Sequence, residues 1–424
     1  MSTFTAVKNE GSLKSGCEFN IRQIREDFPI LNQSCYGKSL VFLDSAASAQ
    51  KPKSVINAIK YCYEHEYANI HRGVYLLSER ATQMYENTRA KVKDFINASE
   101  ASEVIFTKGT TEAINLVASS YGETALSAGD EVILSRMEHH ANIVPWQLIK
   151  ERVGIEIKIA PIDKNGNFLL HEFEKLISSR TRIVAITHAS NVLGTITPVS
   201  DIIRLAHAAG AVVLLDGAQA VVHSEVNVQK LDVDFYTFSG HKLYGPTGVG
   251  VLYAKKKWLE KLPPYIGGGA MISEVKKEKI IYAPIPEKYE AGTMPTAEVI
   301  TFNESIKFVE SIGMDNLIKH ENEITNYALE KLKKINSVKI IGNPKNKAGV
   351  IAFTVKGVHP HDIATILDED GVAIRAGHHC CQIFHKKMNL SATARASIGV
   401  YNTKDDIDML CKAIENCRKI FDLK

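Results

Sequence analysis

A carboxylate and an amine follow two strand-like runs of the sequence. Asp216 ends the run VVLLD in Asp216-Gly-Ala-Gln219, and Lys242 follows the run FYTFS in Ser239-Gly-His-Lys242. Because ligands of parallel sheets bind at the carboxyl ends of strands, we expect both side chains in one crevice. A buried lysine has a depressed pKa and can act as a Schiff-base nucleophile, and a carboxylate can pair with a cofactor's ring nitrogen. The pair favours a pyridoxal phosphate site; a surface lysine and a helix-capping aspartate are the alternative for either residue alone.

A second cluster, Gly109-Thr110-Thr111-Glu112, comes directly after the run EVIFTK and begins a helical pattern. Hydroxyls and free backbone N–H groups at a helix N-terminus form an anion site, which favours a doubly charged phosphate. Taken alone, the segment is a good helix N-cap. Beside a phosphate-bearing cofactor it becomes a candidate phosphate site.

The third cluster is Arg375-Ala-Gly-His-His-Cys380-Cys381, with Thr393-Ala-Arg395 downstream. Histidines beside cysteines indicate metal ligands, a nucleophilic thiol or ordinary buried residues. We disfavour a metal, because four adjacent residues cannot easily wrap one ion and the usual two-residue ligand spacings are absent. A thiol near Arg375 and two imidazoles is expected to have a lowered pKa, which would make it nucleophilic. The stretch alone leaves a reactive and a structural cysteine equally open.

Short β-rich runs alternate with helical patterns through the centre of the chain. The expected strands are residues 103–107, 131–135, 155–159, 182–187, 212–216 and 235–239. Helical patterns between them include TEAINLVASSYG and VSDIIRLAHAAG, the second closing on Gly210 as its C-cap. Continuous apolar strands separated by helices predict an α/β fold whose mostly parallel sheet is covered on both faces.

The pattern changes near residue 300, where we expect a smaller α+β domain to begin. A long helical stretch over 302–334 precedes the strand-like VIAFTV, a helix over 361–370, the strand-like RASIGV and a final helix. The predicted division is a flexible tail over 1–20, a segment over 21–40 that packs with the small domain, a large domain over 41–300 and a small domain over 301–424.

Composition excludes several classes of protein. The 51 Lys and Arg nearly balance the 48 Asp and Glu, and the net charge of +3 gives no basic footprint for nucleic acid. The 45% of hydrophobic residues is typical of globular domains. No apolar run reaches the ~18 residues of a membrane span, and the first segment lacks the apolar core or arginines of a leader. Seven scattered cysteines do not indicate a disulfide framework, so we expect a reduced, cytoplasmic protein with no membrane or nucleic-acid partner.

Several long motifs resemble those of the Suf-type (group II) cysteine desulfurases, within the class-V aminotransferase-like family of pyridoxal phosphate enzymes. The motifs are FLDSAASAQKP, NIHRGVY, GTTEAINLVA, MEHHANIVPWQ, THASNVLGTI, DGAQA, DFYTFSGHKLYGPTGVG, EAGTMPT, RAGHHC and RASIGVYNT. The resemblance runs from about residue 28 to the C-terminus. It implies a fold type I pyridoxal 5′-phosphate-dependent transferase, and a homodimer with active sites at the subunit interface.

The resemblance also implies a role for each residue that matches a motif. Lys242 would form the Schiff base with the cofactor, Asp216 would hold its ring nitrogen protonated, and Gln219 would hydrogen-bond its ring hydroxyl. His139 would stack on the ring and is a candidate for proton transfer. The cofactor phosphate would be held by Thr111, Ser239, His241 and Thr293 of the partner subunit.

On the substrate side, Asn191 and Arg395 would bind the carboxylate, with Arg375 nearby, and Asn191 would also contact the cofactor. Cys380 would be the nucleophile. Its thiolate would take the sulfur of L-cysteine as a persulfide, leaving L-alanine, and would pass the sulfur to a small acceptor protein of the Suf system for iron–sulfur cluster assembly. The alternatives are selenocysteine lyase or cysteine sulfinate desulfinase activity at the same site, a transaminase, and an idle scaffold paralogue.

A few positions depart from the family pattern or match it weakly. Cys381 stands where many relatives have a small non-thiol residue; in extended backbone it would face away from Cys380, although a resolving role is an alternative. Met294-Pro295 follows Thr293 where a Pro-Asn pair is common. His71 and Glu112 match positions near the active-site entrance, but a surface histidine and a helix cap are the simpler interpretations.

Overall fold

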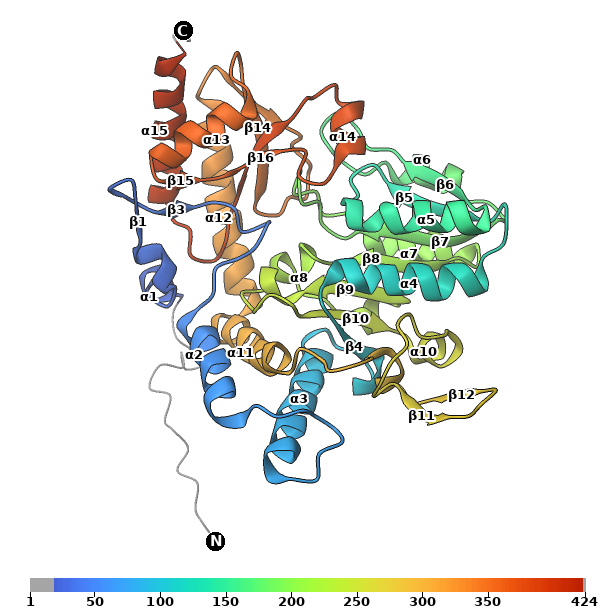
Figure 1. Cartoon of the computed structure of the whole chain (residues 1–424). Coiled ribbons are helices and arrows are strands. Elements are labelled where there is room, and N and C mark those ends of the chain that lie inside the picture. Colours follow the sequence, from blue (N-terminus) through green and yellow to red (C-terminus); the bar gives the residue numbers. More distant parts are fainter. Residues whose placement is uncertain (1–18, 422–424) are drawn as a thin grey trace.

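The structure, a computed structural model, describes residues 19–421, and its elements form two main sheets with helices around them, besides three two-stranded sheets (Figure 1). A tail was expected over residues 1–20. Its residues 1–18, which include Cys17, lie outside the described residues. No helix within residues 19–421 is long and apolar enough to cross a membrane.

The larger sheet has seven strands in the order β4-β10-β9-β8-β7-β5-β6. They are β4 (Val104–Thr107), β5 (Glu131–Ser135), β6 (Glu156–Ala160), β7 (Thr181–Thr187), β8 (Val212–Asp216), β9 (Phe235–Ser239) and β10 (Gly250–Ala254). Only β10 runs against its neighbours, β4 and β9. The mostly parallel sheet is confirmed, and the six expected strands match to within one residue at each end. The sequence analysis missed β10, because its short run follows a glycine-rich segment that resembles a loop.

Helices cover both faces of this sheet, which explains its continuous apolar strands. Alternate strand residues pack against α4 (Thr110–Ala125) and α5 (Val144–Val153) on one face. The other set packs with α7 (Val199–Ala208), α3 (Leu76–Phe95) and α11 (Thr296–Ile312). Gly210, just beyond α7, has φ +78°, and its N–H donates to the carbonyl of His207, as expected of a glycine that ends a helix.

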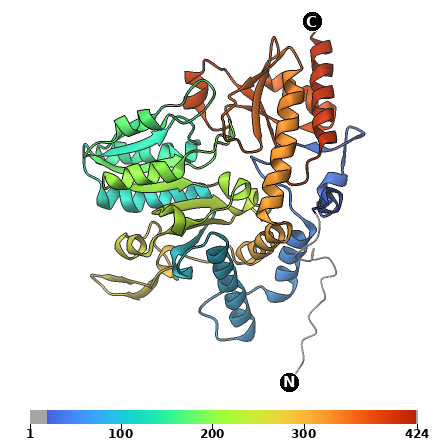
Figure 2. The ribbon, with the colours of Figure 1, turned by 180° about the vertical axis from the view of Figure 1, so that it is seen from behind.

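The smaller sheet is antiparallel, in the order β13-β14-β17-β16. Its strands are β13 (Val338–Ile341), β14 (Val350–Val355), β16 (Arg375–Gly377) and β17 (Thr393–Ser397). The helices α12 (Met314–Lys333), α13 (Pro360–Glu369) and α15 (Lys404–Ile420) pack with it, and α12 lies beside α15 (Figure 2). The smaller α+β unit agrees with the composition of the C-terminal third.

The helical stretch expected over 302–334 is not one helix. Gly313, with φ +83°, separates α11 from α12. α11 packs on α2 (Lys53–Tyr61) and α3, beside the large sheet, whereas α12 packs on α15 beside the small one. The break lets one continuous stretch of sequence serve two cores, which periodicity alone cannot reveal.

The N-terminal part of the chain begins beside the small sheet and then passes to the large one. Arg25, on α1 (Ile21–Glu26), pairs with Asp406 at 2.9 Å. Next, β3 (Val41–Phe42) pairs with β15 (Val372–Ala373), and Asp44 bridges to Ser397. We therefore propose a two-domain division in which the chain crosses between the domains near residues 44 and 313, rather than at 41 and 301.

A buried ion pair ties the helical layer to the large sheet. Arg89 of α3 binds Glu290 through two N–H···O contacts, at 2.7 and 2.9 Å, and both side chains are at most 3% exposed. Glu290 also accepts from the Phe106 backbone N–H at 2.7 Å and from the Tyr85 hydroxyl at 3.0 Å. One carboxylate thus joins α3, β4 and the loop after residue 289.

Replacing Arg89 by Met should destabilise the protein strongly, because it leaves the Glu290 carboxylate buried without a counter-charge. We expect a loss of about 3–5 kcal/mol in the free energy of unfolding, measured by urea titration. The matched control is Arg152→Met, which breaks an exposed pair with Glu123 and should cost less than about 1 kcal/mol. Equal losses in the two variants would contradict this account of the Arg89–Glu290 pair.

Candidate active site

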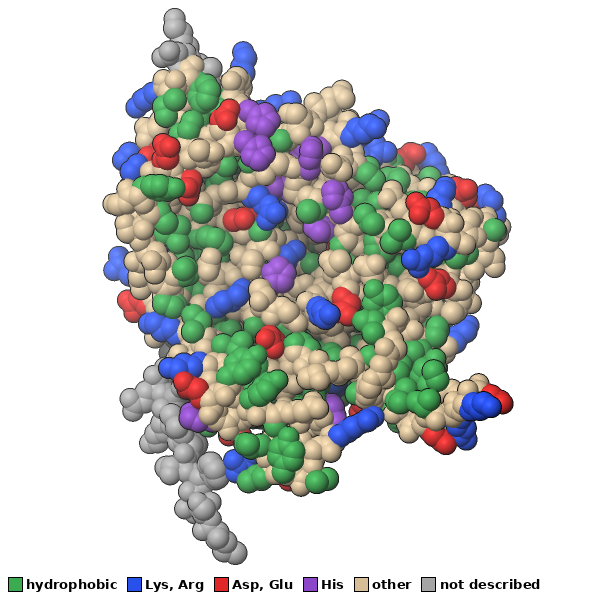
Figure 3. Space-filling view, in the orientation of Figure 1, with side chains coloured by type: hydrophobic (Ala, Val, Ile, Leu, Met, Phe, Trp, Pro, Cys, Tyr) green, Lys and Arg blue, Asp and Glu red, His purple; other side chains and the backbone are tan. Residues whose placement is uncertain are grey.

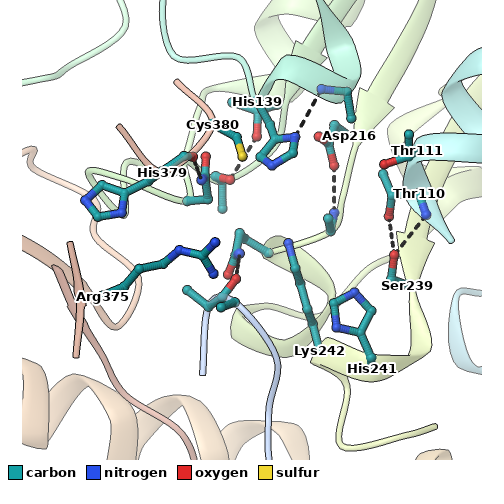
Figure 4. A pocket seen from close by; sticks show the side chains of 18 of the residues that line it. Thr110, Thr111, His139, Asp216, Ser239, His241, Lys242, Arg375, His379 and Cys380 are labelled. Atoms are coloured by element: carbon teal, nitrogen blue, oxygen red, sulfur yellow. Dashed lines mark hydrogen bonds between the residues drawn. The ribbon is translucent and has the colours of Figure 1, made fainter. Parts of the chain in front are cut away.

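A cavity of about 240 Å³ lies where the carboxyl ends of β4, β7, β8 and β9 meet the small sheet (Figure 4). In the space-filling view, histidine side chains gather on the face above its mouth (Figure 3). Most of the predicted site residues line this cavity: Thr111, His139, Asn191, Asp216, Gln219, Ser239, His241, Lys242, Arg375, Cys380 and Arg395. Thr293 is exposed and does not line it, and neither do His71 and Glu112.

Lys242 and Asp216 supply the amine and the carboxylate of the cavity. Lys242 ends the short helix η5 (Gly240–Lys242) directly after β9, and Asp216 is the last residue of β8. Burial lowers the pKa of Lys242 to about 8, against the opposing effect of Asp216. Burial also raises the pKa of Asp216, although its Oδ1 accepts from the Ala218 N–H at 3.0 Å. An amine with a depressed pKa is more often uncharged near neutrality, which suits it to attack a carbonyl.

The N-terminus of α4 faces Ser239. The Ser239 hydroxyl is 2.8 Å from both the backbone N and the Oγ1 of Thr110. Gly109 has φ +156°, and a Cβ added at Gly250 would lie 2.4 Å from the Cα of Gly109. Because Gly250 has no side chain, the loop before α4 lies directly against β10. This close contact positions the N-terminus of α4 as an anion site that opens on the cavity.

At this end of the cavity, the structure defines the charge of His241 and the hydrogen bond of Glu112. His241 is neutral at physiological pH, because burial and then Lys242 lower its pKa to about 4. Glu112 accepts from the Lys108 backbone N–H, so it caps the start of α4, in line with the simpler of its two interpretations.

His139 stands over the cavity as a neutral imidazole. Its Nδ1 accepts from the Ala141 N–H at 3.1 Å, and burial together with Lys242 lowers its pKa to about 3. The proton of the ring is therefore on Nε2. The preceding carboxylate, Glu138, is fully buried and accepts from the Thr187 N–H at 3.0 Å and from Asn142 at 2.7 Å. It fixes the segment that carries His139.

A guanidinium from the small sheet reaches the large domain at the opposite side. Arg395 on β17 is 2% exposed; it donates to the Asn191 carbonyl at 3.0 Å and pairs with Asp44 at 2.6 Å. Its Nε has no partner within the described residues. Gln219 donates to the Ala46 carbonyl at 2.8 Å and closes the same wall. Arg395 thus keeps free N–H capacity for a planar anion such as a carboxylate.

Cys380 is on a strained loop between β16 and α14 (Gln382–Lys387). His379 and Cys380 have φ values of +52° and +56°, which non-glycine residues rarely adopt. Contacts from the large domain hold both carbonyls: Asn191 Nδ2 donates to that of His379, and the His140 N–H to that of Cys380, each at 2.7 Å. The loop turns the partly exposed Cys380 sulfur toward the cavity (Figure 4).

The structure corrects the expected surroundings of this thiol. The His379 ring hydrogen-bonds to Thr393, and burial followed by Arg395 lowers its pKa to about 2, so it adds no positive charge. The cationic side chains of the cavity wall are Arg375, as expected, together with Arg395 and Lys242.

Cys381 is fully buried, and the extended backbone expected beside it is not found. The backbone at Cys380 is left-handed rather than extended, and the Cys381 N–H returns to the His378 carbonyl. Burial and then Glu138 raise the pKa of Cys381. A resolving role for this thiol finds no support in the structure.

Two residues near the site were not singled out as site residues from the sequence: Asp44 and Glu138. Asp44 and Glu138 each sit inside a motif quoted above, FLDSAAS and MEHHAN, and a carboxylate in such a motif is the signal that could have drawn attention to them. Asp44 binds Arg395 and Glu138 binds the Thr187 N–H, and both of these partners are distant in sequence, so only the fold reveals those contacts.

The donor set fits pyridoxal phosphate. A buried carboxylate can face a ring nitrogen, a buried amine can bind the carbonyl carbon, and the Gly109–Thr111 cradle with Ser239 offers N–H and hydroxyl donors to a phosphate. Lys242 Nζ has no hydrogen-bond partner among the described residues, so it remains available. Residues 19–421 contain no group of three or more His, Cys, Asp or Glu side chains that could hold a metal.

Comparison with known proteins gives a consistent result. Residues 41–410 match the Aminotransferase class-V family. A protein of Halalkalibacterium halodurans named probable cysteine desulfurase is 48% identical over 402 residues, which cover 95% of this chain and 99% of that protein. The crystal structure of the cysteine desulfurase CsdA (S-sulfonic acid) from Escherichia coli superposes with a TM-score of 0.89 at 38% identity, over 95% of this chain and all of that one. The apo structure of a cysteine desulfurase from Thermococcus onnurineus also gives 0.89, at 36% identity over 94% of this chain and 98% of that one.

The two adjacent thiols should differ sharply in reactivity. With iodoacetamide at neutral pH, we expect Cys380 to be alkylated at least about ten-fold faster than Cys381, whose thiol is buried and has a raised pKa. Tandem mass spectrometry of the peptide that contains both residues distinguishes the two sites. Cys381→Ser should leave the fast labelling intact, and Cys380→Ser should remove it; rapid labelling of Cys381 would contradict the observed burial.

Proposed function

We propose, from the premise that the chain belongs to the aminotransferase class-V family and is a pyridoxal 5′-phosphate-dependent cysteine desulfurase, that it carries the sulfur of L-cysteine as a persulfide on Cys380. The observation that carries the proposal is the position of Cys380. Its loop is held by a hydrogen bond from Asn191, and Cys380 lines the same cavity as Lys242 and Asp216.

At the cofactor end of the cavity, each side chain has a separate role. Bound pyridoxal phosphate supplies a ring that withdraws electrons from the substrate Cα. Asp216 holds the ring nitrogen protonated, and that positive charge offsets the burial that raises the Asp216 pKa. Lys242 would hold the cofactor through its Nζ, and the same amine, when free, would accept the Cα proton of the substrate. Neutral His139 covers the ring and keeps its Nε2 proton available for transfer.

The phosphate and hydroxyl of the cofactor meet the remaining predicted residues. Thr111, Ser239 and His241 hold the phosphate, with the helix N-terminus of α4 beneath it. Gln219 contacts the ring hydroxyl, and Asn191 contacts both cofactor and substrate.

At the other end, Arg395 binds the substrate carboxylate through its free N–H groups, and the more exposed Arg375 adds positive charge at the entrance. The thiolate of Cys380 would attack the substrate sulfur: an S–S bond forms, and the Cβ–S bond breaks and leaves its electron pair on the carbon side. Cβ then gains a proton, and the Cα proton held by Lys242 returns to Cα to give L-alanine. Substrates are thereby selected for a carboxylate and a sulfur at the correct separation.

The working unit we propose is a homodimer that donates sulfur in the cytoplasm to a small acceptor protein of the Suf system, for iron–sulfur cluster assembly. Exposed apolar side chains support the dimer: Val74 is 96% and Leu76 60% exposed, and Val275 on the hairpin β11 (Ile272–Val275) is 63% exposed. Arg72 donates to the Ile272 carbonyl, which brings the segment before α3 close to this hairpin. Thr293, exposed in this chain, reaches the phosphate of the partner's site.

Replacing Cys380 by Ser should abolish desulfuration while the cofactor stays bound, because the sulfur acceptor is lost and Lys242 is untouched. The measurement is alanine and sulfide released from L-cysteine in the presence of a reductant, with the visible absorption of the bound cofactor recorded in parallel. Cys381→Ser is the matched control and should retain turnover. Desulfuration that persists in Cys380→Ser would reject Cys380 as the nucleophile; turnover of selenocysteine alone in that variant would favour the lyase alternative.

The shared site predicts complementation between two inactive variants. Lys242→Ala removes the amine of its own site, and Thr293→Asp places a negative charge near the phosphate of the partner's site. Random mixing of the two should restore roughly a quarter of wild-type activity, because each mixed dimer has one intact site. Mixing wild-type chain with the double variant gives the reference level for site dilution. If the two single variants never recover activity together, Thr293 does not serve the partner.

A further inference from the structure

Lys51 is a half-buried cation that the proposed mechanism does not use. It precedes α2, and its Nζ donates to the carbonyls of Ala49 and His241, the latter at 2.9 Å. No carboxylate among residues 19–421 pairs with it, and burial lowers its pKa to about 8. Buried cations of this fold, such as Arg89 and Arg395, each have a carboxylate partner. An ammonium whose only partners are neutral carbonyls keeps its positive charge uncompensated, so it is able to attract an anion that comes from elsewhere.

The carbonyl that Lys51 binds belongs to the segment of the phosphate end. Besides the Lys51 ammonium, the His241 carbonyl accepts from the Ala49 N–H at 3.1 Å and from the Ser48 hydroxyl at 3.4 Å. Three donors from residues 48–51 thus converge on one acceptor, between Ser239 and Lys242 in sequence. Lys51 also contributes to the lowered pKa of His241, so its charge is felt at the imidazole that lines the cavity.

The phosphate end of the cavity has no cationic side chain of its own. Within the described chain it is lined by the hydroxyl groups of Thr110, Thr111 and Ser239 and by the neutral ring of His241. The helix N-terminus of α4 adds only partial positive charge. A cofactor phosphate carries nearly two negative charges, which leaves this end short of positive charge.

We propose that Lys51 is the positioning residue that supplies this missing charge, holding the His241 segment in place and attracting the phosphate from behind it. The inference rests on the proposed function, because it assumes that pyridoxal phosphate occupies the cavity. It adds a role for a residue that does not line the cavity and touches the cofactor only through His241.

Lys51→Met is the test, because it removes the ammonium and keeps the length of the side chain. Purified full-length dimer is freed of cofactor and then titrated with pyridoxal 5′-phosphate and, separately, with pyridoxal, which lacks the phosphate; bound ligand is measured by equilibrium dialysis. We expect Lys51→Met to weaken pyridoxal phosphate binding about ten-fold or more and to leave pyridoxal binding nearly unchanged. Lys51→Arg, which keeps the charge, should restore most of the loss.

The matched control is Lys288→Met. Lys288 is a buried lysine that also donates to two backbone carbonyls, those of Leu259 and Glu260, but it lies away from the cavity. Its replacement should leave the ratio of the two affinities at the wild-type value. If Lys51→Met does not fold, Lys51→Gln, which keeps a donor for the His241 carbonyl without the charge, gives the same comparison.

The outcomes separate this inference from the proposed function. A preferential loss of pyridoxal phosphate binding supports the role of Lys51. Equal losses for both ligands show that Lys51 only holds the backbone, and unchanged affinities show no role at the site; either result overturns the inference. Wild-type protein that binds neither ligand would overturn the proposed function itself.

Discussion

Asn191 makes the contact on which the geometry of the site depends. Its backbone carbonyl accepts from Arg395, and its side-chain amide donates to the carbonyl of His379, so a loop of the large domain holds both the carboxylate clamp and the thiol loop. Both partners belong to the small domain. The distance between the amine of Lys242 and the sulfur of Cys380 is therefore set by how the two domains meet, rather than by either domain alone.

The same junction explains why the chain crosses between domains more than once. After β3, which pairs with β15, Asp44 bridges to Ser397 of the small sheet and reaches Arg395, and the chain then enters the large domain through the wall of the cavity. Gly313 allows α11 to remain on the large sheet while α12 joins the small one. Such crossings are typical of sites between domains, because each crossing adds a covalent restraint to a boundary that otherwise depends on side-chain contacts.

The charged groups of the site differ from the ion pair that ties α3 to the large sheet. Arg89 and Glu290 are both buried and compensate each other's charge. At the site, Lys242, Asp216 and Lys51 have no salt-bridge partner among the described residues, and burial shifts the pKa of each toward the uncharged form. Groups left in that state are poised to respond to a charged ligand.

The sequence determined the parts whose signal is local. The six parallel strands follow from short apolar runs, and the residues after β8 and β9 were assigned to one crevice because parallel strands end at the same edge. The motifs placed nearly all the site residues, because each motif carries its residue types at fixed spacing. The dual roles of Asn191 and Asp44 could not be predicted, since their partners are more than 180 positions away in the chain. The left-handed backbone at Cys380, the buried state of Cys381 and the neutral ring of His379 were likewise decided only by the tertiary structure, because backbone strain and pKa both depend on what packs around a residue.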